Sequence, residues 1–431
     1  MRVLMFGWEF PPHITGGLGT ACYGLTKGLS KQGTEIIFVV PKAYGDEDQQ
    51  VVSIRNASGI PFDINDEEYK AYWKHIQYIE IGSNIIPYVS PEYFSKVTRK
   101  KQKTGEERVS HVFSRHFEFS GTYGNNLMEE VARYALIASA LALKENFDVI
   151  HAHDWLTYPA GIAAKKSSGK KLVVHMHATE FDRTGGNVNQ QVYDIEKEGM
   201  EEADAVITVS NLTRNIVIEK YGISPEKVFT VHNAVDQNTM KQHRGNTKHF
   251  HEKLVTFLGR ITFQKGPEYF IEAAYKVLQK DPDIRFAMAG SGDMLYRMIR
   301  RVAQLRIADK FHFTGFLQGN DVDHIFSMSD VFVMPSVSEP FGIVPLEAMR
   351  SSVPVIISKQ SGVAEILHHA LKVDFWDIDA MADAIYGLCH YDGLSKMFKK
   401  YGRQEVENLK WEDAALKVIN IYNQLLNNTI R

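Results

Sequence analysis

The segment "RVLMFGWEFPPHITGGLGTACYGLTKGLSKQGTEIIFVV" (residues 2–40) holds two apolar runs on either side of a helical stretch. Its first part, "RVLMFGW", is a continuous apolar run closed by Gly and Pro, which is typical of a buried strand. The next part, "TACYGLTKGLSKQG", predicts a helix that stops at Gly33, and "EIIFVVP" predicts a second strand. A strand, a helix and a strand in this order predict the start of a parallel α/β sheet.

The same alternation continues along the chain. Further apolar runs are "FDVIHAH", "KLVVHMH", "ADAVITVS" and "KVFTVHNAV", and the alternation restarts at "KLVTFLGR" after a polar segment. We therefore predict two doubly wound α/β domains, 1–237 and 252–410, joined by a linker over 238–251. Residues 411–431 have the apolar spacing of an amphipathic helix. Ligands of doubly wound domains bind at the carboxyl ends of the strands, so we expect a cleft between the two domains.

Composition restricts the classes of protein to consider. The chain has 431 residues, of which 44% are hydrophobic and 23% charged, as in globular domains with sizeable cores. A net charge of -3 argues against nucleic-acid binding through bulk charge. Cys22 and Cys389 lie far apart, which excludes a disulfide framework and a cysteine-rich zinc site and suits a reducing cytoplasm. The apolar run 131–143 contains Arg133 and is too short to span a bilayer. We expect a cytoplasmic protein.

The region from Ile60 to Gly121 is less regular and contains a basic run, "KVTRKKQK", from Lys96 to Lys103. Charge runs of this kind are usually solvated loops. The alternative is a weak peripheral contact with a membrane or another anionic surface, or with an acceptor.

A glycine-rich turn, "PPHITGGLGT", follows the first strand. Gly16, Gly17 and Gly19 would let the backbone approach a ligand where the helix begins. A dinucleotide-binding fingerprint would require a third spaced glycine, and Cys22 stands there instead. The second strand ends in Val39, Val40 and Pro41, without the acid that would hold a ribose. Hydride transfer from a nicotinamide cofactor is therefore poorly supported.

Histidines close two neighbouring strands. His151, His153 and Asp154 end one of them, and His175 and His177 end the next. Histidines two apart on a strand share a face. Metal binding is one interpretation, but no third cluster with ligand spacing follows. The other interpretation is that His177 donates a hydrogen bond or handles a proton in the cleft, with His153 and Asp154 in an acceptor or sugar pocket.

Two cations follow the first strand of the second domain, in "LGRITFQKG". Arg260 ends the strand, and Lys265 lies in the loop before a helix that we expect to begin near Pro267. Two cations at such a turn can hold a diphosphate and stabilise charge on a leaving phosphate. A solvated loop is the alternative.

Two glutamates flank an apolar turn in "SEPFGIVPLEAMRSS". The helix is expected to begin near Pro345, which leaves the preceding backbone N–H groups available to an anion; these belong to Phe341, Gly342, Ile343 and Val344. A carboxylate beside a phosphate would repel it, so Glu339 and Glu347 are expected to accept hydrogen bonds from sugar hydroxyls. Glu347 alone could instead be an ordinary first-turn acid. Together with the two cations and the glycine turn, the set predicts a nucleotide-sugar site.

These motifs resemble those of the retaining glycosyltransferases of the GT-B fold, specifically family 4 with its glycogen and starch synthases. The resemblance covers nearly the whole chain, and its strongest motif is the pair Glu339 and Glu347 separated by seven residues. The cation pair, "GGLG", "HAHDW" and "AGSGD" (289–293) also match.

The resemblance implies roles for these residues. Glu347 would bind the donor ribose, and Glu339 with the amides after it would hold the transferred sugar. Arg260 and Lys265 would hold the diphosphate, so that no metal and no cofactor are needed. Other residues implied on the donor side are Gly290 and Leu317. The implied partners are a nucleoside-diphosphate sugar and an oligo- or polysaccharide acceptor, and the last helix would cross back onto the first domain.

One position departs from the pattern. Bacterial glycogen synthases that use ADP-glucose carry a lysine two residues before the glycine pair, where this chain has Ile14 and Thr15 ahead of Gly16. This leaves UDP-glucose, GDP-mannose and other donors open. The function expected from the sequence is transfer of a hexosyl unit, glucose in the first instance, with retention of configuration. The alternatives are a non-hydrolysing nucleotide-sugar epimerase of the same fold and a silent carbohydrate-binding scaffold.

Overall fold

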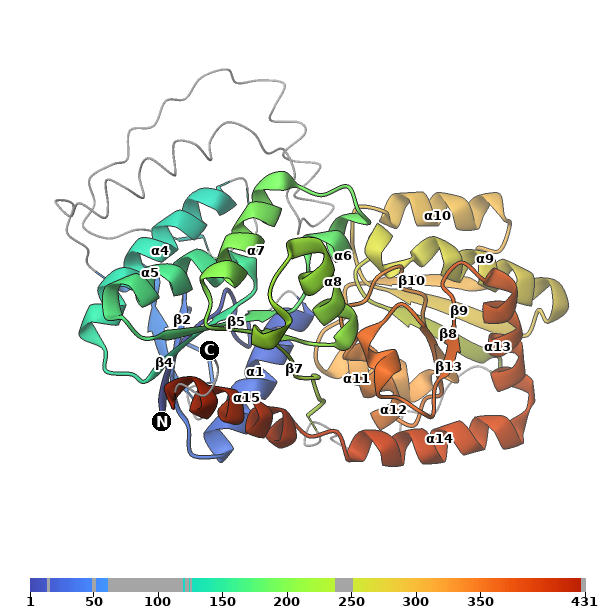
Figure 1. Cartoon of the computed structure of the whole chain (residues 1–431). Helices are drawn as coiled ribbons and strands as arrows, with labels where there is room; N and C mark the ends of the chain where they lie inside the picture. The colour runs from blue at the N-terminus through green and yellow to red at the C-terminus, as the bar shows by residue number, and fades with distance from the viewer. Residues whose placement is uncertain are drawn as a thin grey trace, which may run out of the picture.

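A computed structural model describes residues 1–13, 16–48, 52–60, 119–120, 124, 126–236 and 251–427. The basic run Lys96 to Lys103, the linker except for its last residue, and Ile14 with Thr15 lie outside these ranges. Figure 1 shows two layered α/β units side by side, each with helices on both faces of a sheet.

All strands of the first sheet are parallel, in the order β3-β2-β1-β4-β5-β6-β7. They are β1 (Arg2–Phe6), β2 (Glu35–Val40), β3 (Ser53–Asn56), β4 (Val149–His153), β5 (Lys171–Met176), β6 (Ala205–Thr208) and β7 (Val228–Thr230). The helices that connect them are α1 (Gly17–Lys31), α4 (Leu127–Lys144), α5 (Tyr158–Ser168), α6 (Glu180–Thr184), α7 (Gln190–Glu202) and α8 (Asn211–Tyr221). The strand order reverses between β1 and β4, so the glycine turn after β1 and the histidines at the end of β4 lie at a switch point, where such folds bind ligands.

The second sheet is also parallel, in the order β10-β9-β8-β11-β12-β13. Its strands are β8 (Lys253–Leu258), β9 (Ile284–Ala289), β10 (Phe311–Gly315), β11 (Val331–Met334), β12 (Val355–Ser358) and β13 (Leu371–Val373). Its helices are α9 (Pro267–Lys280), α10 (Leu295–Gln304), α11 (Asn320–Met328), α12 (Val344–Arg350), α13 (Ile378–His390) and α14 (Asp392–Glu407). The order reverses between β8 and β11, which places the loops that carry Arg260, Lys265 and Glu339 at the second switch point.

Each sheet is buried on both faces. Successive side chains of β1 enter different apolar clusters, because side chains of a strand alternate between the faces of its sheet. Leu4 and Phe6 pack with α4 and α5, whereas Val3 and Met5 pack with α1 and α15 (Trp411–Leu426). This double burial explains why the strands appear in the sequence as continuous apolar runs.

The last helix belongs to the core of the first unit. In Figure 1, α14 runs along the second unit and leads into α15, which lies against α1. A side chain at Gly24 of α1 would place its Cβ 2.1 Å from the Trp411 ring, so only glycine allows the helices this close an approach. Tyr422 of α15 is fully buried and hydrogen-bonded to Nδ1 of His151, in the middle of β4. In the described part of the chain, no helix is both long and apolar enough to cross a membrane.

Candidate functional site

The centre of the candidate site is a contact between two loops of the second unit. The Lys265 ammonium group pairs with the carboxylate of Glu339, which also accepts a hydrogen bond of 3.2 Å from Ser336 Oγ. Glu339 is 6% exposed. Gly266, at φ 63°, follows Lys265 directly, and a Cβ there would lie 2.1 Å from the carbonyl oxygen of Pro335. The backbone therefore holds Lys265 tightly against the loop after β11.

Arg260 lies in the same loop as Lys265, and its Nη2 donates to Gln264 Oε1 over 3.1 Å. The neighbouring "AGSGD" loop packs on the backbone beside it. Gly290 has φ 142°, and a Cβ there would lie 1.8 Å from Gly259 O. Gly290 is thus required for backbone packing that supports the Arg260 loop. Leu317, the other predicted donor-side residue, is half-buried against Leu254 and Ile325.

The turn after Glu339 presents backbone donors. Phe341 is buried, and its carbonyl accepts from Val363 N over 2.8 Å, which anchors the turn. Gly342 has φ 103°, a left-handed conformation that other residues rarely adopt. Within the ranges that the structure describes, the N–H groups from Phe341 to Val344 donate no hydrogen bond. They precede or begin α12 and are available to an anion.

Glu347 lies in the first turn of α12 and is partly buried. Burial raises the pKa of its carboxyl group to about 7; Arg350 opposes this rise and Asp323 adds to it. The carboxyl group forms no hydrogen bond with any residue that the structure describes. A carboxyl group in this state can gain stabilisation from the hydroxyls of a ligand.

The four histidines at the ends of β4 and β5 form one stack, with ring centroids 4.3 to 5.4 Å apart. Burial lowers the pKa of His151 and of His177 to about 3, so both rings are neutral near pH 7. His153 Nδ1 and His177 Nε2 share a hydrogen bond of 3.0 Å. His177 alone of the four is partly exposed, and the other three are buried.

Two groups in this stack have the spacing of metal ligands. His151, His153 and His175 offer nitrogens within 4.8 Å of one another, but their rings are stacked within 18° to 28° of parallel. Lone pairs in parallel planes do not converge on one ion, because each lies in the plane of its own ring.

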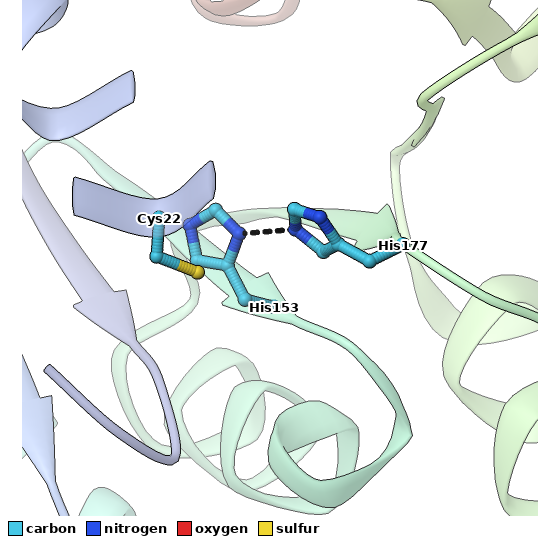
Figure 2. A group of neighbouring side chains, drawn as sticks. All are labelled: Cys22, His153 and His177. Atoms are coloured by element: carbon cyan, nitrogen blue, oxygen red, sulfur yellow. Dashed lines mark hydrogen bonds between the residues drawn. The ribbon is translucent and has the colours of Figure 1, made fainter. Parts of the chain in front are cut away.

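The second group is Cys22, His153 and His177, drawn in Figure 2. A thiolate and two imidazoles are zinc-type ligands. However, the two ring nitrogens already satisfy each other, and burial followed by the charges of Glu9 and Asp154 raises the pKa of the Cys22 thiol. We therefore interpret this group as a neutral cluster beneath the site, held by the His153–His177 hydrogen bond, in which only His177 is partly exposed.

Some of the remaining predicted residues lie at the surface of the site, and others are buried beneath it. Gly16 and Gly17 face open space, where a Cβ would meet nothing within 4 Å. The Gly19 N–H donates to Glu9 Oε1 over 3.2 Å. The sequence predicts His153 and Asp154 in the sugar pocket, whereas the structure leaves them 0% and 2% exposed. Asp154 faces the buried Arg183 over 3.7 Å, so it supports the site from beneath.

The two units touch across the site. The Glu365 carboxylate, from the second unit, accepts from Asn211 N over 2.9 Å and Leu212 N over 2.7 Å, and it pairs with His232 over 2.8 Å. Burial alone would raise the pKa of Glu365, but His232 and these amides outweigh burial and hold it below the usual value. A Cβ at Gly362 would lie 2.4 Å from Ser210 Cβ. These contacts fix the position of the second unit relative to the first.

Several residues of the site were not predicted from the sequence. They are Glu9, Asp182, Arg183, Glu196, Ser336, Ser338 and Glu365. One of them had a detectable local pattern, because Thr179 and Asp182 have the spacing of a capping box, and the structure forms it. The others depend on contacts between distant parts of the chain.

Comparisons with known proteins agree with this geometry. Residues 2–226 match the family model described as "Starch synthase catalytic domain", and residues 238–405 match "Glycosyl transferases group 1". An uncharacterized glycosyltransferase of Methanocaldococcus jannaschii is 28% identical, over 98% of both chains. A glycogen synthase of Mycobacterium tuberculosis is 24% identical, over 98% of this chain and 94% of its own.

Among solved structures, a sucrose-phosphate synthase of Thermosynechococcus elongatus superposes with a TM-score of 0.73 at 18% identity, over 99% of both chains. At this identity the likeness concerns the fold alone. The prediction of a GT-B fold, with two doubly wound domains, is confirmed.

Proposed function

Because this chain belongs to the family of glycosyltransferases defined by the starch synthase catalytic domain, we propose that it transfers a glucosyl unit from a nucleoside-diphosphate sugar to an α-glucan acceptor, with retention of configuration. The observation that supports this best is that Lys265, Glu339 and the N–H groups before α12, which have no acceptor among the described residues, belong to neighbouring loops. Cations, a carboxylate and backbone donors in one place suit a diphosphate joined to a sugar. The glycogen synthase relative supports glucose and a glucan.

The donor would bind to the second unit. Arg260, Lys265 and the N–H groups from Phe341 to Val344 would receive the diphosphate, and Glu347 would accept hydrogen bonds from the ribose. The Lys265–Glu339 pair would then change partners, since the diphosphate would take the ammonium group and a sugar hydroxyl would take the carboxylate. His177, from the first unit, is partly exposed and neutral, so it can donate a hydrogen bond to the sugar.

The reaction would proceed on one face of the sugar. The bond from the anomeric carbon to the diphosphate oxygen would break while the acceptor hydroxyl attacks from the same side. The leaving phosphate would take the hydroxyl proton, so no protein nucleophile is needed. Arg260, Lys265 and the N–H groups would stabilise the charge that gathers on the leaving oxygen. In this proposal the protein's own cations do the work that a divalent ion does in other transferases.

The decisive test is a panel of donors and acceptors. UDP-glucose, ADP-glucose, GDP-mannose and UDP-N-acetylglucosamine would each be incubated with and without maltoheptaose in EDTA. Elongated maltoheptaose with an α-linked product supports the proposal. Isomerised nucleotide sugar without acceptor would identify an epimerase, and donor or glucan binding without turnover would identify a silent binding protein. Because Ile14 and Thr15 replace the lysine of ADP-glucose users, we expect ADP-glucose to be a poorer donor than UDP-glucose.

A further inference from the structure

The short helix α6 (Glu180–Thr184) contacts two loops of the second unit that carry proposed donor ligands. It begins three residues after His177, in the first unit. Its Asp182 accepts a hydrogen bond from Ser338 Oγ of the second unit, and Ser338 precedes Glu339 directly. A single hydrogen bond thus links the segment that carries His177 to the segment that carries Glu339.

Asp182 is tied to the His177 segment by its second oxygen. Asp182 Oδ2 accepts from Thr179 N over 2.8 Å and from Thr179 Oγ1 over 2.7 Å, while Oδ1 receives Ser338. Asp182 is 1% exposed, so these bonds are shielded from water and fix its orientation. Any displacement of Ser338 therefore acts on Thr179, two residues from His177.

α6 also touches the loop of Lys265. Gly185, which ends the helix at φ 62°, lies so close to Phe263 that a Cβ there would stand 2.5 Å from its ring. Phe263 opens the single turn Phe263–Lys265 that places Lys265. The helix thus contacts both segments of the second unit that supply the candidate site.

A buried arginine fixes α6 to the first unit. Arg183 donates to Ala178 O over 2.9 Å and, through both terminal nitrogens, to Glu196 Oε1 over 2.8 Å. Asp154 and Glu180 each lie 3.7 Å from its guanidinium group. Ala178 is the neighbour of His177, so this network holds the backbone of His177 from beneath. Burial raises the pKa of Glu196 to about 8, although Arg183 and Tyr221 oppose this rise.

We propose that Asp182 is a positioning residue: its bond to Ser338 sets His177 against Glu339 when the two units close on the donor. This inference rests on the proposed transferase function and adds a residue to it. Asp182 does not itself touch the sugar, since it is buried and its carboxylate is occupied by Thr179 and Ser338. Its effect is exerted through His177.

The test is a double-mutant cycle between Ser338 and His177. Ser338→Ala removes one hydrogen bond to a carboxylate, so kcat is expected to fall about tenfold while the KM for the donor changes little. Ser338→Thr keeps the hydroxyl and is expected to restore most of kcat. In a His177→Ala background, Ser338→Ala should have almost no further effect on kcat, because the residue that it positions is gone.

The matched control is Glu365→Gln, which weakens another contact between the units but reaches Asn211, Leu212 and His232 instead of α6. Glu365→Gln should change kcat by the same factor in the wild-type protein and in the His177→Ala variant. Thermal unfolding of each variant establishes that it is folded. If Ser338→Ala, like Glu365→Gln, lowered kcat by the same factor with and without His177→Ala, the inference would be overturned. The bond between Ser338 and Asp182 would then be only a contact between the units. If the wild-type protein transfers no sugar at all, the proposed function fails instead, and the two failures are distinct.

Discussion

Lys265 and Glu339 form an ion pair although they are 74 positions apart in the chain. They lie at the carboxyl ends of β8 and β11, the neighbouring strands at which the order of the second sheet reverses. Glu339 is 6% exposed, and the carboxylate would be costly to bury without a partner. The pair therefore stabilises the two loops that it joins, and it could exchange partners with a charged ligand.

Removing either cation should impair turnover strongly. Lys265→Ala or Arg260→Ala is expected to lower kcat about 10²–10³-fold, as for the loss of one donor to a transition-state oxyanion. Lys265→Ala should also lower Tm, because it leaves Glu339 buried without its partner, whereas Lys265→Ala with Glu339→Gln should recover much of that loss. Steady-state kinetics and thermal unfolding measure the two effects. A Lys265→Ala enzyme with normal kcat would remove Lys265 from the proposed mechanism.

The two glutamates should differ in which part of the donor they affect. Glu347→Ala is expected to weaken binding of free nucleoside diphosphate and of the nucleotide sugar alike, by roughly tenfold or more, because both carry the ribose. Glu339→Ala should weaken only the nucleotide sugar. Isothermal titration of both variants with both ligands measures this. Equal loss of free nucleotide in the two variants contradicts the assignment.

Glu347 should also give stability a dependence on pH. Its pKa is raised to about 7 in the folded protein from the ordinary value of 4.5, so the folded state binds this proton more tightly than the unfolded chain does. That contribution to stability is complete below the unfolded pKa and is lost as the pH rises through about 7. Glu347→Gln imitates the protonated group at every pH. The Tm difference between variant and wild type should therefore grow in favour of the variant between about pH 5 and about pH 8, and a constant difference would contradict it.

The packing of α15 on α1 gives a prediction about stability far from the site. Gly24→Val would push a side chain into the Trp411 ring, which lies 2.1 Å from an ideal Cβ at that position. Overpacking of this kind costs about 1–3 kcal/mol, seen as a lower midpoint in urea. Gly393→Val is a suitable control for the loss of helical glycine, because a Cβ at Gly393 meets nothing within 4 Å. Equal stability of the two variants would contradict the packing described here.

The sequence predicted the parts of the fold that have strong local patterns. β1, α1 and β2 are two continuous apolar runs and an amphipathic stretch, and all three are present. β3 (Ser53–Asn56) was missed because it is polar and lies at the sheet edge. The five-residue α6 was missed because it is shorter than two helical turns and shows no periodicity.

The candidate site was predictable where its residues follow strand ends within recognisable motifs, as Arg260, Lys265 and Glu339 do. The buried residues that support the site could not be predicted in this way. Asp154 carries the polar side chain expected of a pocket residue, yet it lies beneath the site beside Arg183, which comes from another segment. Such a network depends on tertiary contacts, and a single sequence gives no local sign of which buried charges meet.

The central feature of the proposed reaction is retention of configuration without a metal, and one measurement tests it directly. The purified enzyme would be mixed with UDP-glucose and maltoheptaose in EDTA. Proton NMR would then record the anomeric signals of the first product as it forms. A retaining transferase that needs no metal should give a new α-glucosidic signal that grows as the UDP-glucose signal falls, at a rate that EDTA does not change. A β-linked first product, or a reaction that stops in EDTA and resumes with a divalent ion, would contradict it.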